Sequence, residues 1–242
     1  MTTTPTPSAK TVTLTLGYKG GPGDQPRRTV VIGRRLTGAD LMAIGDQPES
    51  RSPTQLNLSL IAAAITEFGD LPIPVPLTVL LSLKSIDRED LAAAYAKFVE
   101  ETAGGGTAAR LTDTRYRLAR GFEIGGVVYD VVEFGDLLTG YDELEAEEFE
   151  GWRRACFLIG KQIGSISQSA GAARLEGPVA VESFEPLDAE DIYSLNDFVG
   201  KWKDSFRSAA RAALQQEAGA GGGDSAAAPA RLDGGDGSQP QS

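Results

Sequence analysis

Residues 85–91 read SIDREDL, and residues 186–192 read PLDAEDI. Both stretches contain an aliphatic residue, Asp, a variable residue, Glu, Asp and a second aliphatic residue. Near a helix N-terminus, an Asp side chain accepts hydrogen bonds from free backbone amides and interacts favourably with the helix dipole. The aliphatic residue in front can act as a hydrophobic staple. The pattern therefore predicts two helices that begin alike, with Asp87 and Asp188 at equivalent positions.

The residues before SIDREDL predict a hairpin followed by helices. Residues 11–35 contain two apolar runs, the first strictly alternating, joined by Gly- and Pro-rich turn residues. Thr37 and Asp40 have the spacing of a capping box at the start of a short helix. A longer helix is expected over residues 52–68, with Pro53 at its first position. PIPVP then interrupts helix formation, and the SIDREDL helix ends near Glu101.

The second half of the chain presents the same order of elements. RYRLARGFEI and VVYDVVEF, joined by Gly125 and Gly126, predict a second hairpin, and GDLL at 135–138 echoes ADLM at 39–42. A long helix is expected next, because apolar residues recur at three- and four-residue steps. This stripe consists of Phe149, Trp152, Cys156, Ile159, Ile163 and Ile166. The PLDAEDI helix closes the half, which suggests a tandem duplication of a unit of roughly 90 residues.

These patterns predict an α+β fold of two tandem repeats, each a β-hairpin followed by a small helical subdomain, with helix dominating. The first repeat is placed at residues 10–102, and the second, with an extended last helix, at residues 110–216. A linker is expected at 103–109. Residues 1–9 and the Gly-, Ala-, Ser- and Pro-rich residues 217–242 have little apolar surface to bury and are expected to be disordered.

Composition argues against several classes of function. The 242 residues include no histidine and one cysteine, Cys156, so imidazole catalysis and Cys/His metal sites are excluded. We therefore predict a non-enzymatic protein without cofactor or metal. The net charge of -11 disfavours nucleic-acid binding. No apolar run is long enough to cross a membrane and no secretory signal is visible, which favours a cytoplasmic location.

Several charged motifs leave two interpretations open. Asp87/Asp90 and Asp188/Asp191 have a spacing that could hold a metal ion, although helix capping explains them more simply. Arg27–Arg28 and Arg34–Arg35 could bind phosphate or could protect an edge strand from pairing. The acidic run 142–150 is either a docking surface or a solvated helix entrance. Cys156 lies in an apolar stripe and is interpreted as a buried small side chain.

The last helix carries the candidate partner-binding residues. An apolar stripe runs along it, formed by Ile192, Leu195, Val199, Trp202 and Phe206. Packing on its own half explains most of this stripe. Its last turn nevertheless extends beyond the point where the first half ends, at Phe98 and Val99, and apolar residues beyond a core are candidates for binding a partner.

The order of elements resembles the small tail assembly chaperones of contractile-tailed, Mu-like bacteriophages. The residues that carry the resemblance are 36–41 (LTGADL) with 86–91 (IDREDL), and 134–138 (FGDLL) with 187–192 (LDAEDI). The resemblance covers most of residues 11–206 as two copies, whereas members of that family usually carry one.

The resemblance implies a protein of the host cytoplasm that has no catalytic residues. Such chaperones bind the tape measure protein, a long apolar helical protein, and keep it soluble while tail tube subunits polymerise around it. We therefore expect the tape measure protein as partner, with the tail tube protein as a second candidate and self-association left open. The main alternative is a structural tail or baseplate component that stays in the virion, and the second is an enzyme that uses carboxylates for catalysis.

Overall fold

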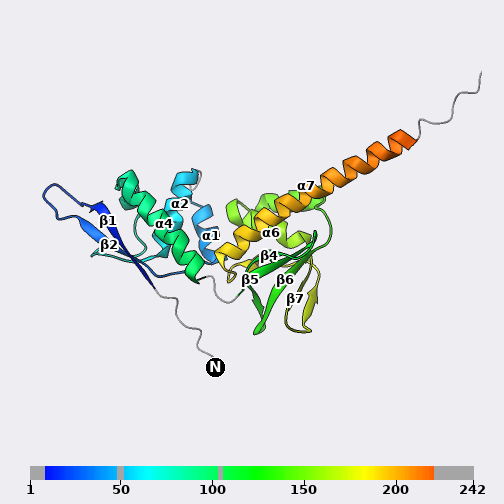
Figure 1. The fold of residues 1–242 in the computed structure, drawn as a ribbon, viewed down its shortest axis with the longest axis horizontal. Coiled ribbons are helices and arrows are strands. Elements are labelled where there is room, and N and C mark those ends of the chain that lie inside the picture. Colours follow the sequence, from blue (N-terminus) through cyan, green and yellow to red (C-terminus); the bar gives the residue numbers. More distant parts are fainter. Residues whose placement is uncertain (1–8, 48–51, 103–105, 221–242) are drawn as a thin grey trace, which may run out of the picture. The chain divides into compact units, whose positions relative to one another are not determined.

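The computed structural model describes residues 9–47, 52–102 and 106–220 (Figure 1). The described residues up to Trp202 form one compact unit, and those from Lys203 onward form a second. Residues 1–8 and 221–242, from the two segments expected to be disordered, lie outside the described residues, as do residues 103–105 of the expected linker 103–109. Residues 217–220 are helical, so the last helix continues to Ala220.

The N-terminal half contains a three-stranded antiparallel sheet in the order β1-β2-β3. Its strands are β1 (Lys10–Tyr18), β2 (Arg27–Ile32) and β3 (Ile65–Phe68). Its helices are α1 (Gly38–Gly45), α2 (Pro53–Ala64), α3 (Leu77–Ser82) and α4 (Ser85–Thr102). Figure 1 shows α4 lying along the β1–β2 hairpin.

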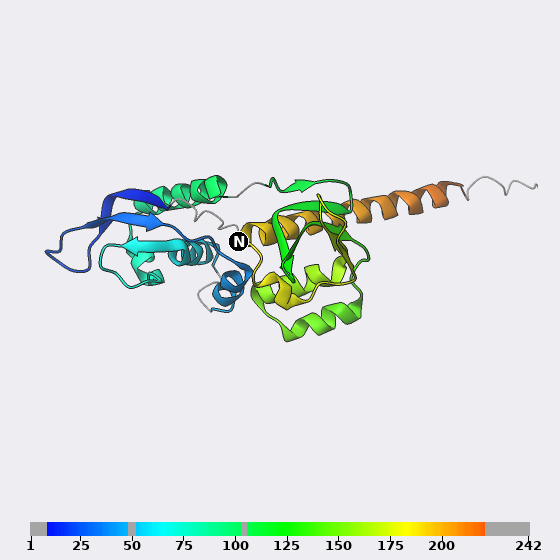
Figure 2. The same cartoon turned by 90° about the horizontal axis from the view of Figure 1, so that it is seen from below.

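The C-terminal half contains a five-stranded antiparallel sheet in the order β4-β5-β6-β7-β8. Its strands are β4 (Ala109–Arg110), β5 (Arg115–Ile124), β6 (Val127–Phe134), β7 (Ile163–Ser167) and β8 (Arg174–Glu176). Its helical elements are α5 (Gly140–Glu145), η2 (Ala146–Glu148), α6 (Gly151–Gln162), η3 (Val181–Phe184) and α7 (Ala189–Ala220). Figure 2 shows α6 and the start of α7 beside this sheet.

The predicted fold class is wrong. We expected a helix-dominated chain of two hairpin-plus-helical-subdomain repeats, but the chain is a mixed α+β protein built on two antiparallel sheets of unequal size. In each half, a strand that follows a helix joins the hairpin, so β3 pairs with β2 and β7 pairs with β6. The hairpins are therefore parts of sheets, and β4 and β8 extend the second sheet further.

The error arose where a helix passes directly into a strand. Residues 52–68 were expected to be one helix, but α2 ends at Ala64 and β3 begins at Ile65. Likewise α6 ends at Gln162, and Ile163 and Ile166 of the predicted helical stripe belong to β7. A short apolar run fits a buried strand as well as a buried helix turn, so periodicity alone did not separate them.

The two halves share narrower local features than the predicted repeat. Gly17 of β1 and Gly121 of β5 both have a positive φ, 77° and 80°, at a β-bulge. A Cβ at either position would lie 2.5 Å from a carbonyl oxygen of the paired strand, so both bulges require glycine. After the hairpin, the N–H of Gly33 donates to Ala64 at 3.2 Å, and that of Gly135 donates to Gln162 at 3.0 Å.

The short capped helices also correspond, although not in the expected alignment. Thr37 donates its backbone N–H to Asp40 Oδ2 at 2.9 Å, and Thr139 donates to Asp142 Oδ2 at 2.8 Å. The matching sequences are therefore LTGAD at 36–40 and LTGYD at 138–142, and the capping threonine of each lies five residues beyond the end of its strand at Ile32 or Phe134. The predicted match of ADLM at 39–42 with GDLL at 135–138 is therefore wrong, because Asp40 corresponds to Asp142 and not to Asp136.

Candidate functional site

The predicted partner-binding stripe on α7 lies largely inside the protein. Ile192 and Leu195 are fully buried, Val199 is 5% exposed and Trp202 is 6% exposed. Trp202 packs against Phe134 of β6, with ring centroids 5.6 Å apart. These four side chains are core residues in this conformation, as the simpler interpretation of the stripe expects. Phe206, in the second compact unit, is 52% exposed.

An Asp of each acidic motif accepts hydrogen bonds from the backbone of a β-bulge and so holds its helix against a strand. Asp87, in the first turn of α4, accepts the backbone N–H groups of Leu16 and Gly17 at 3.0 and 2.9 Å. Asp191, in the first turn of α7, accepts those of three consecutive residues, Ala119, Arg120 and Gly121, at 2.7, 2.9 and 3.1 Å. Both carboxylates are at most 1% exposed. The structural counterpart of Asp87 is therefore Asp191. The prediction that Asp188 is the equivalent position is wrong by three residues.

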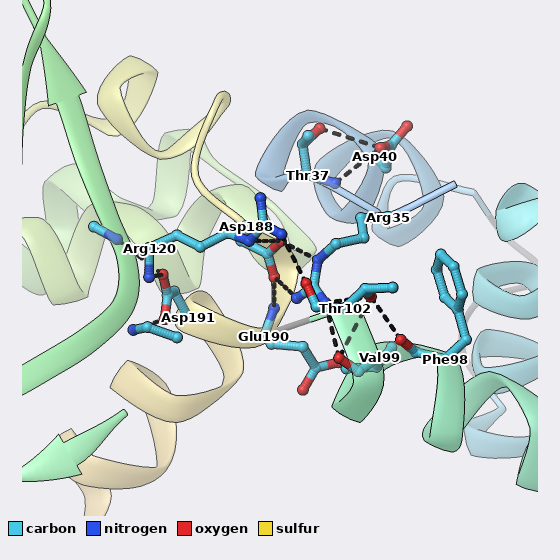
Figure 3. Close-up of polar contacts among 12 residues, drawn as sticks. Arg35, Thr37, Asp40, Phe98, Val99, Thr102, Arg120, Asp188, Glu190 and Asp191 are labelled. Carbon is cyan, nitrogen blue, oxygen red and sulfur yellow. Dashed lines mark hydrogen bonds and ion pairs between the residues drawn. The ribbon is translucent and has the colours of Figure 1, made fainter. Parts of the chain in front are cut away.

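Asp188 has a different role, because it joins the two halves. Its carboxylate receives the guanidinium of Arg35 in a bidentate pair, with both N–O distances 2.6 Å (Figure 3). The same carboxylate also accepts the backbone N–H of Glu190 at 3.1 Å, which caps the start of α7. The capping role predicted for Asp188 is thus confirmed, whereas the one predicted for Asp87 is wrong, because its carboxylate binds backbone N–H groups of β1. The paired side chains are 11% and 8% exposed, so the ion pair is largely shielded from water.

Arginines also occupy the C-terminal end of α4. Arg35 donates from Nη1 to the carbonyl of Val99 at 2.9 Å and to Thr102 Oγ1 at 2.8 Å. Arg120 donates from Nη2 to the carbonyl of Thr102 at 2.7 Å, and its Nε lies 3.6 Å from Asp188. Cations are favourable at the negative end of a helix dipole and anions at the positive end. Negative and positive charges therefore alternate in the order of the C-terminal end of α4, the two arginines, Asp188 and the N-terminal end of α7.

The backbones of the two halves are paired beside this ion pair. The N–H of Gly38 donates to the carbonyl of Leu187 at 2.8 Å, and the N–H of Ala189 donates to that of Leu36 at 3.0 Å. Thr37 and Asp188 form an isolated antiparallel bridge. We call this arrangement, comprising residues 35–39 and 185–190 with Arg120 and Thr102, the half–half junction. The Asp188 carboxylate at its centre is paired with Arg35 and lies near Arg120, which is the chemistry of a structural contact.

The half–half junction perturbs the acids and phenols around it. Burial, with repulsion from Asp188, raises the pKa of Glu190 above its ordinary value. Burial also raises the pKa of Asp191, although its three backbone hydrogen bonds act in the opposite direction. The pKa of Tyr193 is raised by burial to about 12 and that of Tyr95 still higher, so both phenols are neutral at physiological pH.

An accessible apolar pocket lies beside α6, with a volume of about 300 Å³. Phe149 and Phe157 stack with ring centroids 4.9 Å apart, and the ammonium of Lys161 lies 5.1 Å from the Phe157 ring. Lys161 is itself paired with Glu145 at 2.7 Å. The pocket is lined by Phe149, Phe157, Lys161, Pro178, Val179, Ala180, Val181 and Glu182. We call it the α6 pocket.

The α6 pocket was not predicted as a site. Phe149 was assigned to the buried stripe of a long helix, and the segment around Val179 was expected only as a loop. The acidic run 142–150 lies over α5 and η2, beside this pocket, and Glu143, Glu147 and Glu148 in it are exposed. An apolar residue just outside a helix start, such as Phe149 before Gly151, is the sequence signal that could have indicated it.

The other candidate residues are placed as follows. Cys156 is fully buried, and burial raises the pKa of its thiol to about 12, as expected for a core side chain. Arg27 pairs with Asp70, and Arg34 pairs with Asp40 at 2.5 Å. Within the part of the chain that the structure describes, no group of three or more Asp, Glu, Cys or His residues is placed to hold a metal ion.

No family model, no curated protein and no solved structure matches the chain. Across residues 9–47, 52–102 and 106–220, none of the helices combines the length and the apolar character needed to cross a membrane.

Proposed function

We propose that this protein is a non-enzymatic tail assembly chaperone that binds the tape measure protein of a bacteriophage in the host cytoplasm. The proposal rests on the resemblance stated above. The observation that carries it in the structure is the α6 pocket, an accessible apolar site formed by Phe149, Phe157 and Val179. Pockets of this kind accept the apolar side chains of an amphipathic helix, as in helix-in-groove recognition.

The charges around the α6 pocket suit a chaperone. Among the described residues that line it, the one cation, Lys161, is already paired with Glu145, whereas the adjoining residues 142–150 carry several exposed carboxylates. An apolar helix bound here would be covered on one side, and the complex would gain negative charge. Net charge far from zero keeps a protein complex in solution. The chain's net charge of -11 fits that role.

Co-expression tests the proposal. The chain would be produced together with the tape measure and tail tube proteins of the same phage, each singly and in combination, and the soluble fraction would be purified on a tag carried by the chain. We expect the tape measure protein to become soluble and to co-purify. If it stays insoluble and nothing co-purifies, the chaperone function is wrong.

Purified virions separate this function from the alternative of a structural tail or baseplate component. An assembly chaperone leaves before the tail is complete, so it should be missing from virions by quantitative mass spectrometry. A stoichiometric amount in the virion would favour the structural component instead.

A further inference from the structure

At the half–half junction, a short segment of the N-terminal half, which we call the inserted segment, binds against a segment of the C-terminal half, which we call the receiving segment. The segment Leu36–Ala39 lies against residues 185–189, and it is bound through backbone hydrogen bonds and the Arg35–Asp188 pair. The contact is so close that a Cβ on Gly38 would lie 1.9 Å from the carbonyl oxygen of Phe184. A glycine is therefore required where the inserted segment crosses the receiving one.

The N-terminal half has a receiving surface at the corresponding place. Lys84 lies three residues before Asp87, just as Asp188 lies three residues before Asp191. In both halves the N–H of the leucine before this residue donates to the carbonyl three residues earlier, Leu83 to Leu80 and Leu187 to Phe184. A groove of about 390 Å³ opens here, and its lining includes Leu16, Lys19, Arg28 and Lys84. We call it the N-terminal groove.

The counterpart of the N-terminal groove in the other half is already partly occupied. There the cavity at the half–half junction is lined by Arg120 and Asp188, which correspond to Leu16 and Lys84. Arg35, Leu36 and Thr37 of the inserted segment form another part of its lining. The N-terminal groove is thus the same kind of receiving site, and among the residues that the structure describes its lining contains no inserted segment.

The C-terminal half carries the corresponding inserted segment, and it is exposed. Leu138, Thr139 and Gly140 correspond to Leu36, Thr37 and Gly38, because both stretches belong to the matching LTGAD and LTGYD sequences. Gly38 is buried, whereas Gly140 is exposed and a Cβ on it would meet nothing within 4 Å. Within one molecule, no contact of the described residues requires a glycine at position 140.

Apolar residues replace the charges of the half–half junction at the two free surfaces. In the alignment of the two halves, Leu137 corresponds to Arg35, Leu16 to Arg120 and Ile86 to Glu190. These three side chains are 39%, 49% and 45% exposed. Large apolar side chains exposed at matching positions of two complementary surfaces are typical of an interaction site.

We infer that the segment 137–141 of one molecule binds in the N-terminal groove of a second copy, in the way that residues 35–39 bind residues 185–189 within the chain. Leu137, Leu16 and Ile86 form the apolar centre of this contact. The charges also match, because the groove is lined by Lys19, Arg28 and Lys84 while the inserted segment lies between Asp136 and the acidic residues 142–150.

This contact joins two different surfaces, so each bound copy still offers one of them. Such head-to-tail contacts continue into longer assemblies unless the geometry closes a ring. The assembly therefore grows with protein concentration beyond a dimer. It requires no other phage protein, so it can be tested separately from tape measure binding.

The test uses the full-length protein alone, with mass measured by sedimentation velocity and light scattering over a range of concentrations. We expect the average mass of the wild-type protein to rise beyond that of a dimer. Gly140→Ala adds a methyl group where the two backbones would meet, and Leu137→Asp places a charge in the apolar centre. Each should weaken association about tenfold or more. Gly200→Ala is the matched control, because Gly200 is an exposed helical glycine that also has nothing within 4 Å.

Variants that block one surface each provide the decisive measurement. Leu137→Asp keeps the N-terminal groove intact, whereas Ile86→Asp keeps the inserted segment intact. Each should be monomeric alone, and an equimolar mixture should form a 1:1 dimer and nothing larger. Circular dichroism and thermal unfolding identify any variant that fails to fold, and Lys84→Glu then replaces Ile86→Asp. A monomeric wild-type protein at the highest soluble concentration, or association unchanged by these substitutions, would overturn the inference.

Discussion

Asp188, at the start of α7, and Arg35, which follows β2, are 153 residues apart in sequence and form a bidentate ion pair with both N–O distances 2.6 Å. Planar guanidinium and carboxylate groups fit each other in this geometry, and a lysine, whose charge sits on a single nitrogen, cannot form the same two parallel bonds. Because both groups are largely buried, removing either side chain should destabilise the protein by leaving the charge of the other without its main partner. The contact between the halves is therefore open to a direct test.

Arg35→Ala should lower the free energy of unfolding by about 3–5 kcal/mol, since it leaves the buried Asp188 carboxylate without its bidentate partner, with only the Nε of Arg120 nearby at 3.6 Å. Arg35→Lys should retain only part of that stability. The matched control is Arg34→Ala, because the adjacent Arg34 side chain is 50% exposed and its pair with Asp40 should contribute at most about 1 kcal/mol. Urea unfolding followed by tryptophan fluorescence measures all three, and equal losses for Arg34 and Arg35 would contradict the assignment.

The contact between Asp87 and the β1 bulge predicts a second loss of stability. Asp87→Ala would leave the part-buried N–H groups of Leu16 and Gly17 without their acceptor, and a lost hydrogen bond to a charged group costs about 1.5–3 kcal/mol. Asp90→Ala is the control on the same helix, since its contact with Thr15 is long, at 3.4 Å, and exposed. We expect a clear drop in the urea midpoint for Asp87→Ala and a change within about 0.5 kcal/mol for the control.

Glu190 gives the chain a defined dependence of stability on pH. Its pKa in the folded protein is raised above the ordinary value of 4.5, chiefly by burial, so folding favours the protonated form. Its favourable contribution is present below pH 4.5 and is lost as the pH rises through the raised pKa. Glu190→Gln should therefore stabilise the protein at neutral pH and have little effect below pH 4.5. Urea unfolding at both pH values checks this, and a loss of stability at neutral pH would contradict it.

Cys156 predicts slow thiol chemistry in the native state. Because its side chain is fully buried and its pKa is raised to about 12, almost no thiolate is accessible at pH 8. Ellman's reagent should react with the native protein only as fast as the core opens, and at once in denaturing urea. Since the chain contains one cysteine, the signal is unambiguous. Rapid reaction of the native protein would show that the α6 side of the core is open.

Sequence reasoning identified features whose cause is local. The two hairpins, the Thr37–Asp40 capping box and the capping role of Asp188 follow from turn residues and helix-start chemistry, which act over a few residues. The strands β3 and β7 were missed, because their pairing with β2 and β6 is a contact between distant segments. Asp87 and Asp188 were aligned because the sequences around them are similar. The hydrogen bonds to Gly17 and Gly121 instead show that Asp87 corresponds to Asp191.

The candidate site was hidden for a related reason. An apolar stripe on a helix does not reveal which residues a sheet will cover, so Trp202 was expected to bind a partner although it packs on Phe134. The α6 pocket combines Phe149, Phe157 and Val179, which lie up to 30 residues apart and are brought together only by the fold. Charge composition could predict an acidic protein but not where an apolar opening would lie beside the acidic run.

The α6 pocket leads to the last prediction, which concerns the proposed tape measure binding. Val179→Glu places a carboxylate in the apolar lining and Phe149→Ala removes half of the Phe149–Phe157 stack, so both should reduce the amount of tape measure protein kept soluble. Leu175→Ala is the control, because this side chain is 40% exposed on β8 and lies outside the lining of the pocket. Thermal unfolding must show that each variant is folded.

Salt concentration separates the two ways in which the tape measure protein could be held. Apolar burial contributes about 25 cal/mol per Å² and is not screened, so binding through the α6 pocket should survive moderate salt. Docking through Glu143, Glu147 and Glu148 would instead weaken steadily as the ionic strength rises, since the Debye length falls to about 3 Å at 1 M. Co-purification in a salt series distinguishes them. Binding that is abolished by salt but unaffected by Val179→Glu would place the partner on the acidic run and exclude the pocket.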